Sequence, residues 1–214
     1  IPINFIKIFL YNKLLNYKIT YNCKIGFLVV IISNDCLINT TSIESFTILS
    51  VNKLNINYYK IKKFNIIKNF YHLSMNNNCY LGFFNKIVGE RKISNKSSLI
   101  IGRNVRIENK NYLDLTESIY IGENIKISSF CQFWTHGYSA KRKLKIGQIN
   151  LKKNSIINTG CLISHGITVG ENSILEAGSV VVKDLKGEKY YFHKLDENYS
   201  FFSYQARVTQ KKKK

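Results

Sequence analysis

The chain has 214 residues, 45% of them hydrophobic and 13% aromatic, which predicts one folded domain with a sizeable core. Its 32 Lys and Arg residues outnumber 13 Asp and Glu residues. The resulting formal net charge of +19 favours partners such as acidic glycans, phosphorylated cofactors, anionic membranes or nucleic acid. The five cysteines are odd in number and lack CxxC spacing, which argues against a disulfide framework or a zinc knuckle. Free thiols in a reducing cytoplasm fit this pattern better.

Residues 1–20 are weakly patterned and are expected to form an N-terminal cap. The apolar stretch Ile3–Leu15 is interrupted by four polar residues, Asn4, Lys7, Asn12 and Lys13. The stretch is therefore too short and too polar for a membrane span, and it lacks the small-residue cleavage site of a signal peptide. We expect a short helix or strand there, because a repeat protein must cover the open end of its core.

From residue 21 onward, aliphatic residues recur at every sixth position. The runs are Ile25-Ile31-Leu37-Ile43-Leu49, Leu81-Ile87-Ile93-Leu99, Ile101-Ile107-Leu113-Ile119, Ile121-Ile127-Phe133 and Leu151-Ile157-Ile163-Val169-Leu175-Val181. A period of six fits neither an α-helix nor a simple strand. It fits an all-β solenoid, a single-stranded parallel β-helix in which each face of a triangular coil is one hexad long and sends one side chain inward.

The same pattern divides the chain. Residues 21–185 are expected to form the β-helix domain, with an irregular stretch at 53–80 where the repeat is ambiguous. Leu81, Ile101 and Ile121 are spaced by twenty, which predicts equivalent places in successive turns. Residues 134–145 are polar and basic and are expected to be a loop extruded from the coil, where function concentrates. Residues 186–214 are expected to form a C-terminal extension with a basic tail.

Three stretches resemble the hexapeptide-repeat acyltransferases. Residues 121–127 followed by Phe133–His136 are similar to the hexad pair and histidine loop of the galactoside and maltose acetyltransferase type, which includes capsule and lipopolysaccharide O-acetyltransferases. Gly166–Ser173 and Ala177–Asp184 are similar to the closing coil of that superfamily. The resemblance implies a left-handed β-helix, acetyl-CoA as co-substrate without a metal, and a homotrimer with each active site between neighbours.

Acyl transfer to a hydroxyl requires a general base near neutral pH, and histidine suits this task. The resemblance assigns that role to His136, at the start of the predicted loop. His165 is a rival, because its surroundings resemble the histidine motif of sugar N-acetyltransferases. A base also needs an acceptor that orients its second ring nitrogen. Asp114, Glu117 and Glu123 all remain open for that role.

The resemblance also implies the binding residues. The pantetheine arm and phosphates of the co-substrate are assigned to Gly160, Gly166, Ala177, Gly178, the Ser179 amide, Lys183 and Arg207. Acceptor binding is assigned to Trp134 and Tyr138, whose rings can stack on sugars, and to Lys143 of the basic loop. The last assignment allows an acidic sugar acceptor.

The sequence thus predicts a cytoplasmic acetyl-CoA-dependent O-acetyltransferase acting on a surface polysaccharide, either a capsule (acidic, sialic ones included) or lipopolysaccharide. The charge allows peripheral association with the inner face of an anionic membrane. Three alternatives remain open: an N-acetyltransferase of a nucleotide-linked amino sugar, a γ-type carbonic anhydrase that needs three zinc-binding histidines, and a non-catalytic basic β-helix scaffold. No nucleic-acid-binding motif is recognised, so no nucleic-acid partner is expected.

Overall fold

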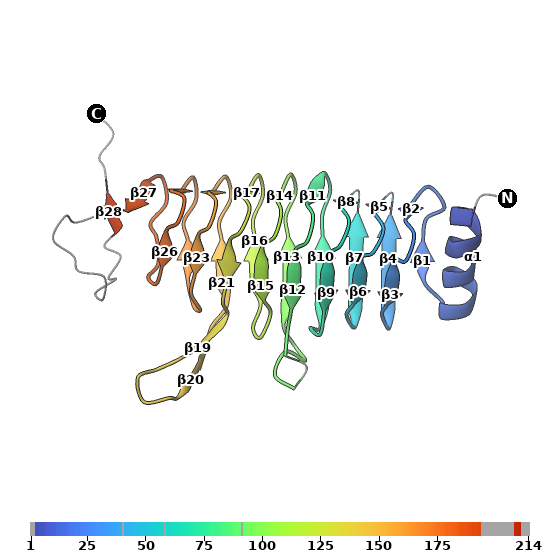
Figure 1. Cartoon of the computed structure of the whole chain (residues 1–214), viewed down its shortest axis with the longest axis horizontal. Coiled ribbons are helices and arrows are strands. Elements are labelled where there is room, and N and C mark those ends of the chain that lie inside the picture. The colour runs from blue at the N-terminus through green and yellow to red at the C-terminus, as the bar shows by residue number, and fades with distance from the viewer. Residues whose placement is uncertain (1–2, 40, 58, 91, 194–207, 211–214) are drawn as a thin grey trace.

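The structure, a computed structural model, describes residues 3–39, 41–57, 59–90, 92–193 and 208–210. It is an all-β, left-handed parallel β-helix of about nine turns, as the hexads and the family resemblance predict. A helix covers the N-terminal end, a hairpin projects from the side, and a short extension continues the C-terminal end (Figure 1).

Each turn contributes one strand to each of three sheets, called here faces A, B and C. Face A contains β1 (Lys18–Ile19), β4 (Asp35–Asn39), β7 (Lys53–Asn57), β10 (His72–Met75), β13 (Ser98–Ile101), β16 (Ile119–Ile121), β21 (Ile149–Leu151) and β24 (Thr168–Val169). Face B contains β2 (Lys24–Ile25), β5 (Ser42–Ile43), β8 (Tyr59–Ile61), β11 (Cys79–Leu81), β14 (Arg106–Ile107), β17 (Lys126–Ile127), β22 (Ile156–Ile157), β25 (Ile174–Leu175), β27 (Tyr190–His193) and β28 (Val208–Gln210). Face C contains β3 (Val30–Ile32), β6 (Ile48–Ser50), β9 (Ile66–Lys68), β12 (Lys86–Val88), β15 (Tyr112–Asp114), β18 (Gln132–Phe133), β23 (Leu162–Ile163) and β26 (Val180–Val181).

The hexad positions form the core, with two corrections. Every predicted inward residue is buried except Leu37 and Ile93. In β4 the neighbours Cys36 and Ile38 point inward instead, because side chains alternate along a strand and this strand is out of phase by one residue. Ile93 is 44% exposed because it lies outside the coil. All five cysteines are buried free thiols.

The predicted twenty-residue equivalence is wrong for Leu81. Ile101 does pair with Ile121 on face A, but Leu81 lies on face B and pairs with Ile107. The reason is an excursion that leaves the coil between β12 and β13, described at residues 89–90 and 92–97 and here called the 89–97 insert. Extra residues at a corner change the sequence spacing between equivalent positions, but they leave the parallel strand pairing of the adjacent turns unchanged.

Residues 53–57 and 59–80 are regular coil, contrary to the expected irregular stretch. They supply β7 to β11, each hydrogen-bonded in parallel to strands of the turns before and after. The ambiguity in the sequence came from aromatic residues such as Phe64, which lies in a corner with φ of 62° and stacks on Phe46 and Phe84. In the sequence, Phe64 is spaced from Ile67 and Tyr71 as on one face of a helix, although in the structure it is a turn residue.

The N-terminal cap is α1 (Ile3–Leu15), and its polar residues close the first turn. The Asn12 side chain donates to the Ile19 carbonyl at 2.8 Å and accepts from the Ile19 amide at 3.0 Å. Asn4 likewise donates to the Cys23 carbonyl at 2.7 Å and accepts from the Ile25 amide at 2.8 Å. A side-chain amide carries both a donor and an acceptor, so each asparagine substitutes for the next strand. No helix in the described part of the chain is long and apolar enough to span a bilayer.

The corners carry rows of their own. Between faces A and B, five asparagines with positive φ form a side-chain ladder with amide-to-amide distances of 2.8–3.0 Å: Asn78, Asn104, Asn124, Asn154 and Asn172. Between faces B and C, the BC corner carries Phe46, Phe64, Phe84, Lys110, Phe130, Gly160 and Gly178, all with positive φ. The third corner, between faces C and A, is the CA corner. Both the 89–97 insert and the hairpin of β19 (His136–Tyr138) and β20 (Leu144–Ile146) leave from it.

At the C-terminal end, β27 adds to face B beside β25, and β28 pairs with β27 antiparallel. Both strands lie within residues 186–214, the stretch expected to form the C-terminal extension. The basic tail Lys211–Lys214 and Arg207 lie outside the described residues.

Candidate active site

The site forms where the hairpin leaves the CA corner. β18 ends at Phe133, and the chain turns outward through Trp134 and Thr135 into β19, which begins with His136. β15 pairs with β18 in register, Leu113 opposite Phe133, so Asp114 at the end of β15 lies beside the start of the hairpin. The ladder of face C therefore brings together residues 22 positions apart in the chain.

His136 contacts Asp114 directly. Its Nδ1 lies 2.7 Å from Asp114 Oδ2, and the exposed fractions of the two side chains are 30% and 5%. The two other candidate partners are engaged elsewhere: Glu117 accepts from the Ser118 amide at 2.7 Å, and Glu123 pairs with Arg103 at 3.1 Å. The geometry thus selects Asp114 from the three acceptors that the sequence left open.

A network of threonines holds the Asp114 carboxylate. Oδ1 accepts from the amide of Thr116 at 3.2 Å and from its hydroxyl at 2.8 Å. Oδ2 accepts from the amide of Thr135 at 3.0 Å, and Thr135 Oγ1 lies 2.8 Å from the same oxygen. The carboxylate is thus fixed at both oxygens before it meets the histidine, which orients the imidazole. These threonines were missed from the sequence: Thr116 bonds Asp114 locally, two residues away, and Thr135 reaches it only through the register of β15 against β18.

Aromatic rings flank the histidine. The ring of Trp134 lies 6.0 Å from that of His136, edge to face, and 4.8 Å from that of Tyr112. Its Nε1 donates to Gln132 at 3.0 Å. Burial raises the pKa of Tyr112 above its usual value, and the nearby Asp114 carboxylate adds to that rise.

The other two predicted acceptor residues lie on the hairpin. Tyr138 ends β19 and is 71% exposed, and Lys143 lies exposed just before β20. All three predicted acceptor residues therefore belong to the segment that carries His136.

His165 lies against the hairpin. A Cβ placed on Gly137 would be 3.0 Å from His165 Cδ2 and 3.3 Å from Nε2, so the ring packs directly on the backbone of Gly137. The base of the hairpin is equally close to the coil, because a Cβ on Gly147 would be 2.7 Å from the Cα of Gly166. The structure thus brings the rival histidine within the same site, in contact with the residue that follows His136.

The predicted co-substrate residues divide between two corners. Gly160, Ala177, Gly178 and Ser179 lie on the BC corner, whereas Gly166 and Lys183 lie on the CA corner next to the hairpin. Face C, with β23 and β26, separates the two groups. The Ser179 amide donates within its own turn to the Glu176 carbonyl at 3.2 Å.

In the last two turns, the BC corner has glycine at its apex. Gly160 and Gly178 have φ of 73° and 76°, and a Cβ on Gly178 would meet nothing within 4 Å. One turn before Gly160, the same corner carries the 54%-exposed ring of Phe130. The corner therefore has a glycine at its apex in two successive turns and an aromatic ring at one end, which fits a long flexible arm lying along it.

Within the described ranges, no three His, Cys, Asp or Glu side chains gather as a metal site requires.

The sequence matches no protein-family model and no curated protein sequence. Solved structures do share its fold. The polysialic acid O-acetyltransferase OatWY superposes with a TM-score of 0.55 at 12% identity, over 88% of this chain and 87% of that chain. A hexapeptide-repeat acetyltransferase from Vibrio cholerae O1 biovar eltor, complexed with acetyl coenzyme A, gives a TM-score of 0.48 at 21% identity over 57% and 66% of the two chains. A maltose O-acetyltransferase from Clostridium difficile 630 gives 0.44 at 24% identity over 54% and 60%.

The chain therefore spans no more than about two thirds of the Vibrio and Clostridium proteins. The resemblance to hexapeptide-repeat acetyltransferases is confirmed at the level of the fold.

Proposed function

We propose that this protein is an acetyl-CoA-dependent O-acetyltransferase that modifies a sugar hydroxyl of a surface polysaccharide, with His136 as general base. The observation that carries the proposal is the hydrogen bond of 2.7 Å between His136 Nδ1 and the buried Asp114 carboxylate at the base of an exposed hairpin. A histidine held in this way, partly open to solvent and beside a tryptophan, fits a base that meets a sugar.

The carboxylate determines which nitrogen acts. Asp114 can only accept, so Nδ1 carries the proton in their hydrogen bond and Nε2 is left as the acceptor. Nε2 takes the proton of the sugar hydroxyl as its oxygen bonds to the acetyl carbonyl carbon. When the carbon–sulfur bond breaks, the imidazolium returns that proton to the sulfur, and Asp114 stabilises the imidazolium between the two steps.

The proposed positions for acetyl-CoA follow from the two glycines on the BC corner. Gly160, Ala177 and Gly178 leave room for the pantetheine arm, and the turn at Ser179 borders it. Gly166 and Lys183 lie on the CA corner, and Lys183 is proposed to meet a phosphate. Arg207 stays a prediction as a second phosphate contact.

The acceptor is proposed to lie over Trp134, Tyr138 and Lys143. Aromatic faces stack on sugar rings, and a lysine on the same hairpin suits an acidic sugar. Acidic polysaccharides, sialic ones included, are therefore the first acceptors to test, beside neutral capsule and lipopolysaccharide sugars. The fold shared with a polysialic acid O-acetyltransferase supports this order.

The test is the release of free CoA thiol from acetyl-CoA, with a panel of neutral, acidic and amino sugars as acceptors. We expect wild type to turn over and His136→Ala to lose about a hundredfold to ten-thousandfold in kcat, which is the usual contribution of a general base. His165→Ala is the matched control, because it removes the neighbouring histidine from the same site. A preference for amino sugars with an N-acetyl product would favour the N-acetyltransferase hypothesis instead. Absence of both acetyl-CoA binding and turnover would refute the proposal and favour a basic scaffold.

We also propose that the protein is a cytoplasmic homotrimer that associates peripherally with the inner face of an anionic membrane. The mass in solution, measured by light scattering, tests the trimer. Sedimentation with anionic and with neutral vesicles tests the association, which should weaken as salt is added.

A further inference from the structure

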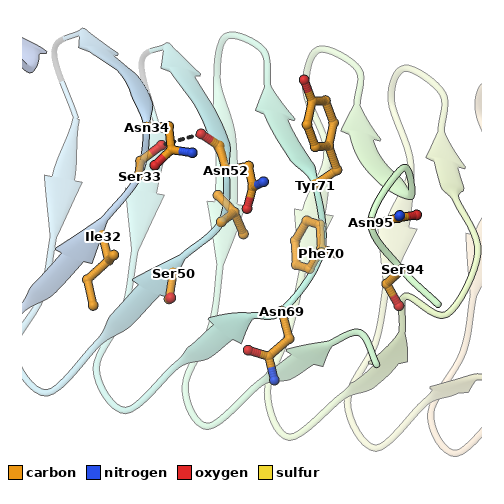
Figure 2. Close-up of a pocket in the computed structure, with 11 residues that line it drawn as sticks. Ile32, Ser33, Asn34, Ser50, Asn52, Asn69, Phe70, Tyr71, Ser94 and Asn95 are labelled. Atoms are coloured by element: carbon orange, nitrogen blue, oxygen red, sulfur yellow. Dashed lines mark hydrogen bonds between the residues drawn. The ribbon is translucent and has the colours of Figure 1, made fainter. Parts of the chain in front are cut away.

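A cavity lies on the same edge of the solenoid as the hairpin. It has a volume of about 350 Å³ and is open along the CA corner of three N-terminal turns, where β3, β6 and β9 end (Figure 2). Ser94 and Asn95 of the 89–97 insert close one end of the row. Its size is in the range of small-molecule binding sites.

The described lining is uncharged and combines polar with apolar side chains. None of the eleven described lining residues is Lys, Arg, Asp, Glu or His, although the chain as a whole carries 32 Lys and Arg residues. Four asparagines line the cavity, Asn34, Asn52, Asn69 and Asn95, together with serines and the rings of Phe70 and Tyr71. An anionic ligand would call for cations, and a metal ion would call for carboxylates, so neither class fits this lining.

Asparagine amides instead fit hydroxyl groups. Each amide offers both donors and acceptors, and each sugar hydroxyl can act as either. Among the described residues, the side-chain amides of Asn34, Asn52 and Asn95 make no hydrogen bond, so they are available to a ligand. The Ser94 side chain beside them is fully buried against Gly89 and helps to form the fixed wall of the cavity.

The cavity is preformed because the insert is tied to the coil. The Ser94 amide donates to the Glu90 carbonyl at 2.7 Å, and Ser97 donates back to the Ser94 carbonyl at 2.9 Å. The Tyr71 amide in turn donates to the Ser97 carbonyl at 3.1 Å, which links the insert to the coil. Gly89 approaches Ser94 so closely that a Cβ there would lie 2.7 Å from its Oγ.

We propose that this cavity binds a neutral sugar unit of the acceptor, so that the acceptor is an oligosaccharide or polysaccharide held at two places along one edge. Both the insert and the hairpin leave the CA corner, on the same side of the solenoid (Figure 1). On face C the order β18-β15-β12-β9 puts β9, which is followed by the lining residues Asn69, Phe70 and Tyr71, three strand spacings from the hairpin, or about 14 Å. A chain of several sugars spans that distance, whereas a single sugar does not. The identification of the ligand as acceptor rests on the proposed function; the binding of neutral sugar does not.

The first experiment measures binding without acetyl-CoA. Glucose and galactose oligomers, from mono- to hexasaccharides, are titrated by calorimetry into wild type, Asn34→Leu and Asn52→Leu. We expect the longer oligomers to bind wild type and each variant to bind about tenfold more weakly, because leucine fills the cavity and removes an amide. Asn95→Ala, in the insert, gives the same test if a leucine variant fails to fold, as judged by its circular dichroism and Tm. His136→Asn is the control that changes the transfer site and leaves this cavity intact.

The second experiment measures transfer against acceptor length. In wild type, KM should fall as the acceptor becomes long enough to reach the cavity, with kcat nearly constant, whereas Asn52→Leu should lose this dependence on length. The proposal is wrong if no neutral oligomer binds wild type, if the variants bind as wild type does, or if only sialic acid oligomers depend on these asparagines. If no acceptor is acetylated but neutral oligomers still bind through Asn34 and Asn52, then the proposed function fails and the sugar site stands. If acetylation succeeds without any dependence on acceptor length, then the claim that the cavity and the transfer site hold the same acceptor chain is wrong, and the other two claims stand.

Discussion

At the scale of single residues, the proposed chemistry depends on one hydrogen bond. In Asp114→Asn, the new amide nitrogen cannot accept, so the donors from Thr116, Thr135 and His136 must share one oxygen. The imidazole then loses the partner that fixes its tautomer, and we expect kcat to fall about a hundredfold to ten-thousandfold with a smaller change in KM. The measurement is steady-state thiol release.

Glu117→Gln is the matched control for that substitution. It makes the same chemical change in the next acidic residue along the chain, and the amide oxygen of glutamine can still accept from the Ser118 amide. We expect near-wild-type activity. Equal losses in the two variants would show that Asp114 has no special relation to His136.

Gly137 provides a second residue-scale prediction. An alanine there would press on the His165 ring at 3.0 Å and displace the hairpin that carries His136. We therefore expect Gly137→Ala to reduce kcat/KM, and the double variant Gly137→Ala/His165→Ala to recover most of it, since the smaller side chain removes the close contact. Kinetics of both single variants and the double variant form the cycle. A double variant no better than Gly137→Ala would contradict the steric explanation.

The sequence predicted His136 but could not choose its partner. A sequence motif can identify the histidine, because few residue types can act as a general base near neutral pH. Its hydrogen-bond acceptor instead depends on which strand pairs with the strand before the histidine. Asp114, Glu117 and Glu123 differ by only a few positions in the chain, and the register of β15 against β18 separates them.

At the scale of elements, Asn4 and Asn12 each tie the N-terminal helix to the first turn by two hydrogen bonds. Asn12→Leu removes both hydrogen bonds to Ile19 and leaves its backbone groups without a partner. We expect a loss of about 1–3 kcal/mol in the free energy of unfolding, because unsatisfied buried groups carry a desolvation penalty. Denaturant unfolding measures it. Lys13→Ala, exposed on the same helix, is the control and should change stability little.

The asparagine ladder can affect the free energy of unfolding in two ways, through its amide hydrogen bonds and through its tolerance of a positive φ. Asn124→Ala removes the amide bonds to Asn104 and Asn154 and puts a Cβ-bearing residue without a local hydrogen bond at φ of 55°. We expect a cost of about 1–2 kcal/mol. Asn124→Gly removes the same bonds and accepts the positive φ, so its cost should be smaller. Equal costs in thermal unfolding would mean that backbone strain contributes nothing here.

Elements with a clear hexad were predictable, because one buried aliphatic per face determines the strand. The phase of β4, the regular coil at 53–80 and the 89–97 insert were not. In β4 the small Cys36 is the inward residue and gives little signal beside Leu37. Inserted residues at a corner preserve the hexads on both sides, so Ile93 kept the period although it left the core.

At the scale of the whole molecule, the charge of +19 should make folding depend on salt. Like charges repel in the compact state, and added ions screen that repulsion over a Debye length of about 8–10 Å at physiological ionic strength. We expect Tm to rise by several degrees between low and physiological sodium chloride, as measured by differential scanning calorimetry. Sodium nitrate at matched ionic strength controls for binding of one particular anion. A Tm that is constant or falls would contradict this view.

Both excursions leave the coil at one corner, and this has a consequence for how such a molecule can change. Each strand takes its register from the strands of the neighbouring turns on the same face, and the entropy of closing a corner loop grows only slowly with its length. The hairpin could therefore be replaced or lengthened as a unit, while the strand pairing of the neighbouring turns stays unchanged. Chimeras that carry a foreign loop at the CA corner should keep their donor specificity and acquire a new acceptor preference, which makes this edge the natural place for the protein to diversify.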